Sequence, residues 1–104
     1  MFLRCDQGFV NSLVVSMSSN LYGPGMVVLR HQEVANVMFV VGGGICQQND
    51  ENGDKVATLE PGSVFNLTAL FFPKPSKGSV VAKTYAEVYE LPRDRFLQIV
   101  EVRG

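Results

Sequence analysis

The sequence contains no tryptophan, a single histidine and only two cysteines, Cys5 and Cys46. Two cysteines do not make a disulfide framework, and without a Cys-x-x-Cys pair they offer no zinc site, so free thiols are the simplest interpretation. The lone His31 also excludes the metal centre of metal-dependent β-barrel proteins, which needs several histidines and a carboxylate on one ion. We expect His31 to be an exposed turn residue, and we expect no bound metal.

Charged residues are sparse, at 18% of the chain, and nine basic and ten acidic residues leave a net charge of −1. The basic residues are scattered, which argues against a nucleic-acid polymer as a partner, since phosphate neutralisation needs a basic face. No apolar run approaches the ~18 residues of a membrane span, and the N-terminus lacks a secretory signal pattern. We therefore expect an intracellular chain that does not itself insert into a membrane.

Catalytic patterns are missing as well. The glycine run at 42–44 lacks the Gly-Lys-Ser/Thr of a phosphate-binding loop, and no helix pattern follows it. One histidine does not provide for a confident Ser-His-Asp or Cys-His set. The acidic stretch at 49–54 lacks the calcium-loop pattern and is typical of a hairpin turn, with Asn52-Gly53 supplying the positive φ. We expect no enzymatic activity.

The sequence does contain many short β-prone runs between glycine and proline turns. At 104 residues and 46% hydrophobic content, the chain is long enough for one domain, spanning 1–104, with one core. About seven short strands at close spacing, between two helices, predict a mainly β fold, an antiparallel β-roll or jelly roll. The strands are expected within residues 21–91, at 26–29, 37–41, 45–48, 55–59, 79–83 and 86–91, with 64–72 open between strand and helix.

Two helices are expected to flank these strands. Apolar residues at helical spacing predict the first over about residues 7–18, ended by Ser18-Ser19-Asn20. The second is expected from about Pro92, with Asp94 in its first turn. Its apolar face is expected to consist of Phe96, Leu97 and Val100.

Four segments, in this order and spacing, resemble a cyclic-nucleotide-binding domain. They are Tyr-Gly-Pro-Gly-Met-Val-Val at 22–28, Met-Phe-Val-Val-Gly-Gly-Gly at 38–44, Leu-Glu-Pro-Gly-Ser-Val-Phe at 59–65, and Thr-Tyr-Ala-Glu-Val-Tyr-Glu-Leu at 84–91. The resemblance covers nearly the whole chain, and the opening helix is most similar to the versions in ion channels and related transporters. It implies a β-roll with a short cassette helix and a cyclic nucleotide as regulatory ligand.

The resemblance also implies where that ligand would bind. A helix N-terminus that faces a small polar loop presents free backbone N–H groups to an anion. The candidate ligand-binding residues of this degenerate cassette are Phe65, Asn66, Leu67, Thr68, Ala69, Ser76, Lys77, Gly78 and Ser79.

The chain departs from the family at the positions that hold the ligand. The family's cassette helix begins with Phe-Gly-Glu, where the glutamate accepts the ribose 2′-OH, and an Arg-Ser/Thr-Ala motif places an arginine on the phosphate. Here Asn66 stands at the glycine, Leu67 at the glutamate, Ser76 at the arginine and Gly78 at the alanine. Losing two charge-assisted hydrogen bonds would cost about 3–6 kcal/mol, or roughly two to four decades of affinity.

Two interpretations of these departures stay open. In the first, the domain has lost nucleotide sensing and acts as a gating or assembly module, its pocket filled by Leu67 or by a segment of a parent chain. In the second, it is a low-affinity sensor of cyclic AMP or cyclic GMP that uses backbone N–H groups of 67–69 and Lys77. Asn66 is expected as a helix cap or left-handed residue, and Ser76 and Lys77 as part of a solvated loop.

Both interpretations place the domain in a larger ion channel or transporter, at the cytosolic face of a membrane. Assembly as a homo-oligomer would come through that parent, and no cofactor is expected beyond cyclic AMP or cyclic GMP as a regulatory ligand. The family usually continues, after the helix that contains Phe96, into another helix that covers the nucleotide. Because the chain stops shortly after Phe96, we expect weaker binding and exposed apolar surface at that end.

Overall fold

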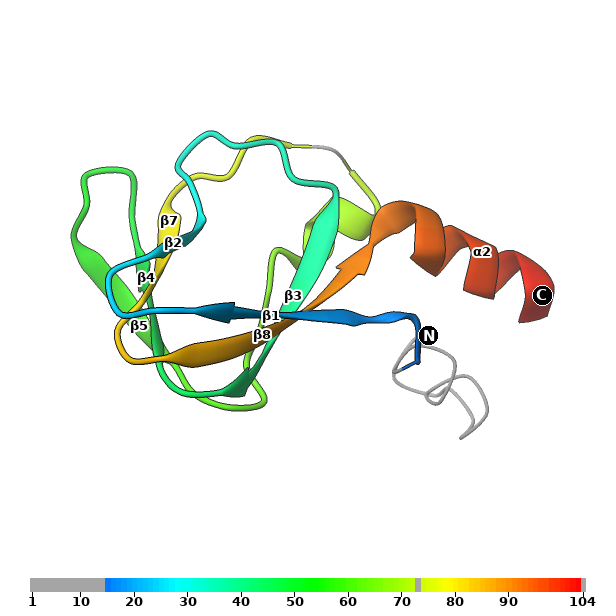
Figure 1. The fold of residues 1–104 in the computed structure, drawn as a ribbon. Helices are drawn as coiled ribbons and strands as arrows, with labels where there is room; N and C mark the ends of the chain where they lie inside the picture. The colour runs from blue at the N-terminus through cyan, green and yellow to red at the C-terminus, as the bar shows by residue number, and fades with distance from the viewer. Residues whose placement is uncertain (1–14, 73, 104) are drawn as a thin grey trace.

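The computed structural model describes residues 15–72 and 74–103, which form strands, one short 3-10 helix and one longer helix (Figure 1). The elements, in chain order, are β1 (Ser18–Tyr22), β2 (Val27–Leu29), β3 (Val37–Gly43), β4 (Cys46–Asn49), β5 (Lys55–Leu59), β6 (Val64–Phe65), the 3-10 helix η2 (Leu67–Leu70), β7 (Ser79–Ala82), β8 (Ala86–Pro92) and α2 (Arg93–Arg103).

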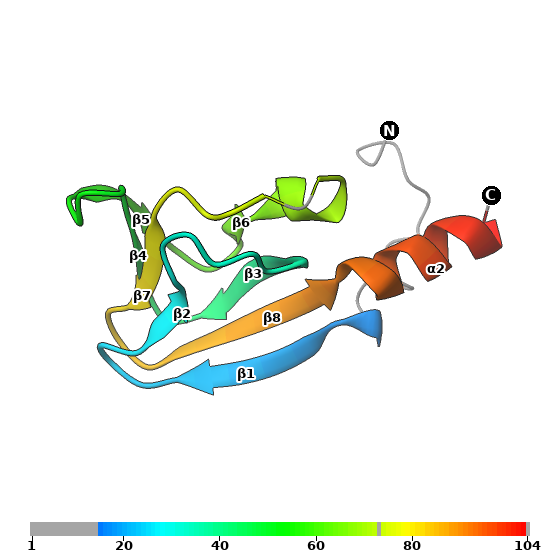
Figure 2. The same ribbon diagram turned by 90° about the horizontal axis from the view of Figure 1, so that it is seen from above.

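The strands form two four-stranded antiparallel sheets, in the orders β1-β8-β3-β6 and β2-β7-β4-β5. The pairing of β3 with β8 is the longest, running from Val37 opposite Pro92 to Gly43 opposite Glu87. Figure 2 shows β8 alongside β1, with β4, β5 and β7 gathered at the end away from α2. The predicted antiparallel β-roll is confirmed.

Apolar side chains between the two sheets form the main core. Because successive side chains of a strand point to opposite faces of the sheet, every second residue of a strand can face this core. At its centre the rings of Phe39 on β3 and Phe65 on β6 stack with their centroids 4.8 Å apart. A second cluster, made of Met38, Leu70, Leu91 and Phe96, packs η2 and α2 against β3 and β8. These two clusters fix β6 and η2, and so they fix the segment in which the sequence places the ligand cassette.

The start of the fold differs from the predicted first helix. Residues 7–14 of that predicted helix lie outside the described part of the chain, Val15 and Ser16 are helical, and β1 already begins at Ser18. Helical structure ends before Ser18, as predicted, but the sequence analysis did not predict the strand that begins there. The strand at Ser18–Tyr22 forms because it pairs with β8, which is distant in sequence. The Asn20 Nδ2 also donates to Glu90 Oε2 at 2.6 Å.

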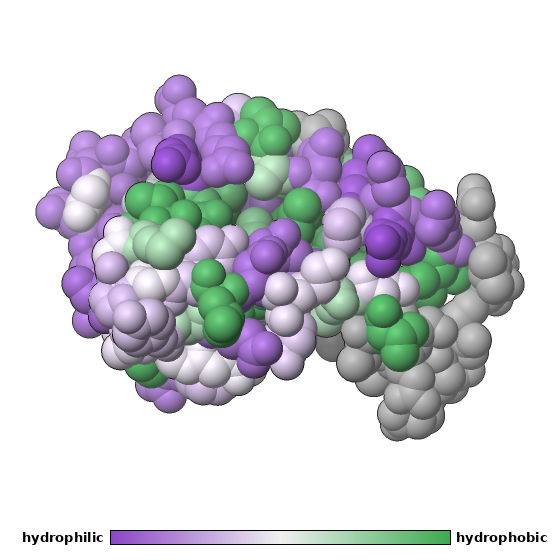
Figure 3. Space-filling view, in the orientation of Figure 1, coloured by the Kyte–Doolittle hydropathy of each residue, from purple (hydrophilic) through white to green (hydrophobic). Residues whose placement is uncertain are grey.

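The C-terminal helix begins close to where the sequence predicts it. Pro92 is the last residue of β8, and α2 starts at Arg93, whose backbone N–H donates to the Asn36 carbonyl at 2.8 Å. Phe96 is buried, as expected, but Leu97 and Val100 are 42% and 41% exposed. On the face of the molecule drawn in Figure 3, which has the orientation of Figure 1, apolar side chains lie in separate patches among polar ones.

Two ionisable groups are affected by burial. Burial, followed by the Glu90 carboxylate, raises the pKa of Tyr22 to about 12, and the Tyr22 hydroxyl donates to Glu90 Oε2 at 3.2 Å. Burial also raises the pKa of the Cys46 thiol, which lies in the main core. A thiol that stays protonated is a poor nucleophile, so Cys46 acts as a core residue.

Candidate ligand-binding site

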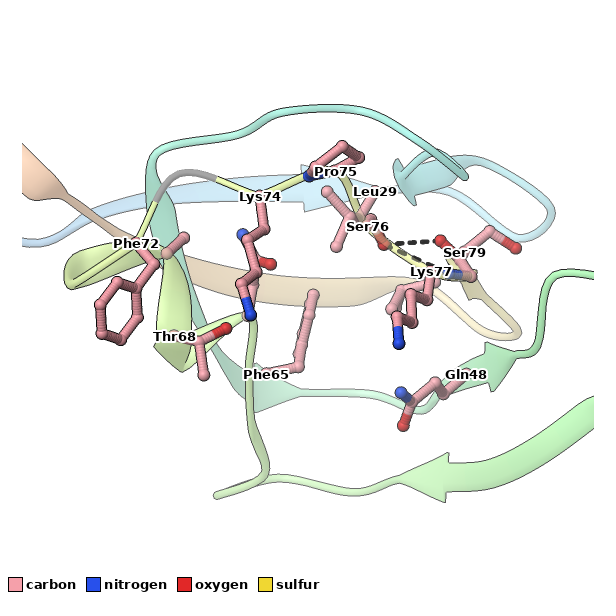
Figure 4. Close-up of a pocket in the computed structure, with 14 residues that line it drawn as sticks. Leu29, Gln48, Phe65, Thr68, Phe72, Lys74, Pro75, Ser76, Lys77 and Ser79 are labelled. Carbon is pink, nitrogen blue, oxygen red and sulfur yellow. Dashed lines mark hydrogen bonds between the residues drawn. The ribbon is translucent and has the colours of Figure 1, made fainter.

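A cavity of about 310 Å³ lies between the β6–η2 segment and the loop that leads into β7 (Figure 4). Apart from Leu67, every candidate residue of the sequence analysis lines it. The other lining residues are Leu29, Gln48, Phe72, Lys74, Pro75 and Val80. The fold thus brings the two halves of the predicted cassette, separated in sequence by the six residues between Ala69 and Ser76, to opposite walls of one cavity.

Leu67 does not fill this cavity. Its side chain is 42% exposed and is not among the lining residues, whereas Ala69 and Leu70 of the same helix are buried. A 3-10 turn of four residues has room for only one buried side, and Leu70 occupies it by packing against Met38. The expectation that Leu67 plugs the pocket is therefore wrong.

Asn66 takes a left-handed backbone conformation, with φ 61° and ψ 28°, and makes no side-chain cap to η2. Its amide Nδ2 instead donates to the carbonyls of Ala35 and Val37, at 3.0 and 2.8 Å. The left-handed conformation is confirmed, and Asn66 does occupy the N-cap position of η2, although its side chain does not cap the helix. Asn66 keeps a conformation that suits the family's glycine, and it uses its side chain to fasten the start of η2 to the start of β3.

The backbone of η2 is partly closed on itself. The Ala69 N–H donates to the Asn66 carbonyl at 3.1 Å, and the N–H groups of Phe71 and Phe72 donate to the Thr68 carbonyl. The expectation of free backbone donors over 67–69 therefore fails at Ala69. A tight i→i+3 turn consumes the donor that a ligand anion would need.

Ser76, at the position of the family's arginine, is held by the surrounding backbone. Its hydroxyl donates to the Gly78 carbonyl at 2.7 Å, and its N–H donates to the Glu33 carbonyl at 3.0 Å. Its carbonyl in turn accepts from the Gln32 N–H at 2.7 Å. These bonds join the loop before β7 to the loop after β2, so Ser76 supports one wall of the cavity.

Gly78 stands where the chain passes very close to β4. A Cβ atom at this position would lie 1.9 Å from the Asn49 carbonyl oxygen, far inside van der Waals contact. The alanine of the family's motif does not fit here without a backbone shift. Asn49 pairs with Ser79, the next residue, so the close approach follows from the β4–β7 register.

Of the described residues that line the cavity, two are positively charged and none is acidic. Lys77 was predicted as a candidate. Lys74 was missed, because nothing in the resemblance marks it, although its place between the cassette and Ser76 was a usable signal. The Lys74 Nζ lies 5.9 Å from the centre of the Phe72 ring, within the range of a cation–π contact.

The cassette also contacts the C-terminal helix. The Arg93 Nε donates to the Leu70 carbonyl at 3.2 Å, and the rings of Phe71 and Phe96 meet edge to face at 5.8 Å. A displacement of η2 would therefore change its contacts with α2.

Within the described residues, no group of three or more His, Cys, Asp or Glu side chains is placed to hold a metal ion. None of the helices there has the length and apolar character needed to cross a membrane.

The model of the cyclic nucleotide-binding domain family matches residues 20–103 of this chain. The chain is a member of this family. It is 27% identical over 101 residues to the human potassium/sodium hyperpolarization-activated cyclic nucleotide-gated channel 4, and 22% identical over 106 residues to potassium channel SKOR of Arabidopsis thaliana. These alignments cover 97% and 98% of this chain but only 8% and 13% of the two channels.

Solved structures of this cyclic nucleotide-binding fold superpose well on the chain. The regulatory domain of Toxoplasma gondii PKA with cAMP gives a TM-score of 0.83 at 22% identity, over 94% of this chain and 39% of that one. The N-terminal domain of a transcriptional regulator from Streptomyces coelicolor A3(2) gives 0.90 at 21% identity, over 98% and 76%. They show a shared fold, and the cavity described above lies in a cyclic nucleotide-binding domain.

Proposed function

We propose that this domain is a regulatory module of a larger ion channel or ion transporter, in which binding of cyclic AMP or cyclic GMP is weak or lost. The observation that carries the proposal is the composition of the cavity wall. Among the described residues that line it there is neither an arginine nor a carboxylate, so the arginine and the glutamate of the family's motif are both absent from the wall.

The residues that replace those contacts support the wall itself. Asn66 bonds to the backbone at the start of β3, and the Ser76 hydroxyl bonds to Gly78. If each lost charge-assisted bond contributed about 1.5–3 kcal/mol, a micromolar site would become roughly millimolar or weaker. The cavity persists, while the groups best able to hold a cyclic nucleotide are absent from it.

The channel context rests on the named relatives, in which the matching region is a small part of a large protein. We therefore propose a regulatory rather than an enzymatic role, at the cytosolic face of a membrane, with the remainder of the parent as the main partner. Homo-oligomerisation would come through the parent. The contacts of η2 with α2 give a gating or assembly module a route from the cassette to the C-terminal helix.

A second candidate function is a low-affinity cyclic AMP or cyclic GMP sensor. The observation that favours it is that Lys77 lines the cavity and can attract a phosphate. Its ammonium is a point charge without the two-pronged geometry of a guanidinium, so the attraction would be weaker than that of the family's arginine.

Restoring the arginine tests the proposal. The change Ser76→Arg is expected to tighten cyclic AMP binding at least tenfold, because a guanidinium–phosphate bond is charge-assisted. The measurement is the dissociation constant by isothermal titration, with the folded state verified by the NMR spectrum. Ser19→Arg adds the same charge on exposed β1 and is the matched control. Equal gains in the two variants would show that Ser76 does not occupy the phosphate position.

A further inference from the structure

The charge of the cavity points to a different ligand from the one for which the family is named. We propose that the cavity binds a dianionic phosphate monoester in preference to a cyclic phosphodiester. The inference rests on the proposed function, because it supposes that cyclic nucleotide is no longer held tightly there.

The first argument is the balance of charge on the wall. Lys74 and Lys77 contribute two positive charges, and none of the lining residues is acidic. The chain as a whole has a net charge of −1, so the wall differs in sign from the rest of the molecule. In the family's motif a single arginine lies on the phosphate, which suits a phosphate group with a single negative charge. A wall with two uncompensated cations suits a ligand with two.

The second argument is the direction of the two side chains. In Figure 4 both lysines extend the same way from the loop before β7, with Phe65 between them in this view. Lys74 ends near Thr68, and Lys77 ends near Gln48. Across the described residues, neither ammonium group has a carboxylate partner at ion-pair distance. The two charges line the same cavity as the Thr68 hydroxyl and the Gln48 amide, which can add hydrogen bonds to a bound anion.

The third argument is the chemistry of the phosphate. A cyclic phosphodiester carries one negative charge, whereas a terminal phosphate monoester carries about −1.5 to −2 near pH 7 and presents three acceptor oxygens. Two lysines can share such a group, each taking a different oxygen. The apolar part of the wall, including Phe65 and Phe72, can accept the organic portion of the ligand.

One neighbouring feature competes for Lys77. A second cavity, lined in part by Asp50 and Glu51, shares Gln48, Lys77 and Gly78 with the first. Lys77 can therefore be attracted away by these carboxylates, whereas Lys74 lines only the first of the two cavities. Lys74 is for this reason the more informative residue to change.

The test compares ligands on the 104-residue chain by NMR titration at low salt. Adenosine 5′-monophosphate and ribose 5-phosphate are the monoesters, and cyclic AMP is the diester. We expect the tighter monoester to bind about tenfold more strongly than cyclic AMP, since the added charge meets two lysines whose individual contributions are modest at an exposed site. The stronger of the two monoesters identifies whether the source is a nucleotide or a sugar phosphate.

Two lysine variants then test whether Lys74 causes the preference for the monoester. Lys74→Gln is expected to reduce the preference for the monoester to about threefold or less. Lys83→Gln, on an exposed residue that lines neither cavity, is the matched control and should keep the full preference. An unchanged preference in Lys74→Gln, an equal affinity for monoester and diester, or no monoester binding at 10 mM (about the limit of weak specific binding) would each overturn the inference.

The two proposals fail in different ways. Tight binding of cyclic AMP would contradict the proposed function, whatever the monoesters do. Weak or absent binding of cyclic AMP, together with no preference for a monoester, would leave the proposed function intact and remove only this inference.

Discussion

Replacing Asn66 by alanine is expected to lower the free energy of unfolding by about 2–5 kcal/mol. The change removes two hydrogen bonds from the side chain to the carbonyls of Ala35 and Val37, each worth about 0.5–1.5 kcal/mol net. It also leaves an alanine in a left-handed conformation. This conformation costs alanine about 1–2 kcal/mol more than it costs a residue that adopts it readily, such as asparagine. Chemical denaturation monitored by fluorescence of the tyrosines, or by circular dichroism, measures the loss.

Asn66→Gly separates the two contributions. Glycine adopts the left-handed conformation freely, so this variant should lose only the hydrogen bonds and cost about 1–3 kcal/mol. If the alanine and glycine variants were equally stable, backbone conformation would not be a reason for asparagine here. A loss below about 0.5 kcal/mol in both would contradict the fastening role of the side chain.

Gly78→Ala is expected to lower the free energy of unfolding by about 2–4 kcal/mol, because overpacking against backbone cannot be relieved by rotating a side chain. The added Cβ would meet the Asn49 carbonyl oxygen at 1.9 Å and its carbonyl carbon at 3.0 Å. The β4–β7 pairing would have to shift, and this pairing forms the end of the cavity that carries Lys77. Denaturation curves measure the stability, and amide shifts at the end of β4 would locate the strain.

Gly43→Ala is the matched control for this prediction. A Cβ at Gly43 would lie 4.0 Å from the Glu87 Cβ, an ordinary contact, and its backbone has no positive φ. We expect its stability to stay within about 0.5–1 kcal/mol of the parent chain. A Gly78→Ala variant as stable as Gly43→Ala would show that the close approach of β4 is not required by the fold.

Most of the strands, namely β2 to β5, β7 and β8, could be predicted from the sequence because turn residues mark their ends. Glycine and proline at 23–25, 42–44 and 61–62 separate apolar runs, and the observed strands begin and end within a few residues of the predicted limits. The Asn52-Gly53 turn was also predicted, but only Gly53 has a positive φ. Asp50 shapes the rest of that turn by accepting from the N–H groups of Asn52 and Asp54.

Features that depend on distant residues could not be predicted. The strand at Ser18–Tyr22 exists because β8, some seventy residues later, pairs with it. The outward direction of Leu67 follows from the burial of Leu70 against β3 and β8, which no local pattern reveals. Lys74 entered the cavity wall only once the fold brought its loop opposite β6 and η2.

The cassette as a whole was predicted better than its individual residues. Its two halves lie on one cavity, as the resemblance implies, but the side chains at its altered positions turn to structural partners. Asn66 and Ser76 stabilise the frame at the places where the family's motif binds ligand. This exchange of roles is the physical basis for expecting a retained fold with weakened nucleotide binding.

An NMR titration of the labelled chain with cyclic AMP and cyclic GMP tests this central claim most directly. We expect dissociation constants of about 1 mM or weaker for both nucleotides, with any saturable shifts confined to residues 65–69 and 74–79. Saturation at micromolar concentrations, with shifts centred on these residues, would contradict the account and establish a functional cyclic-nucleotide sensor.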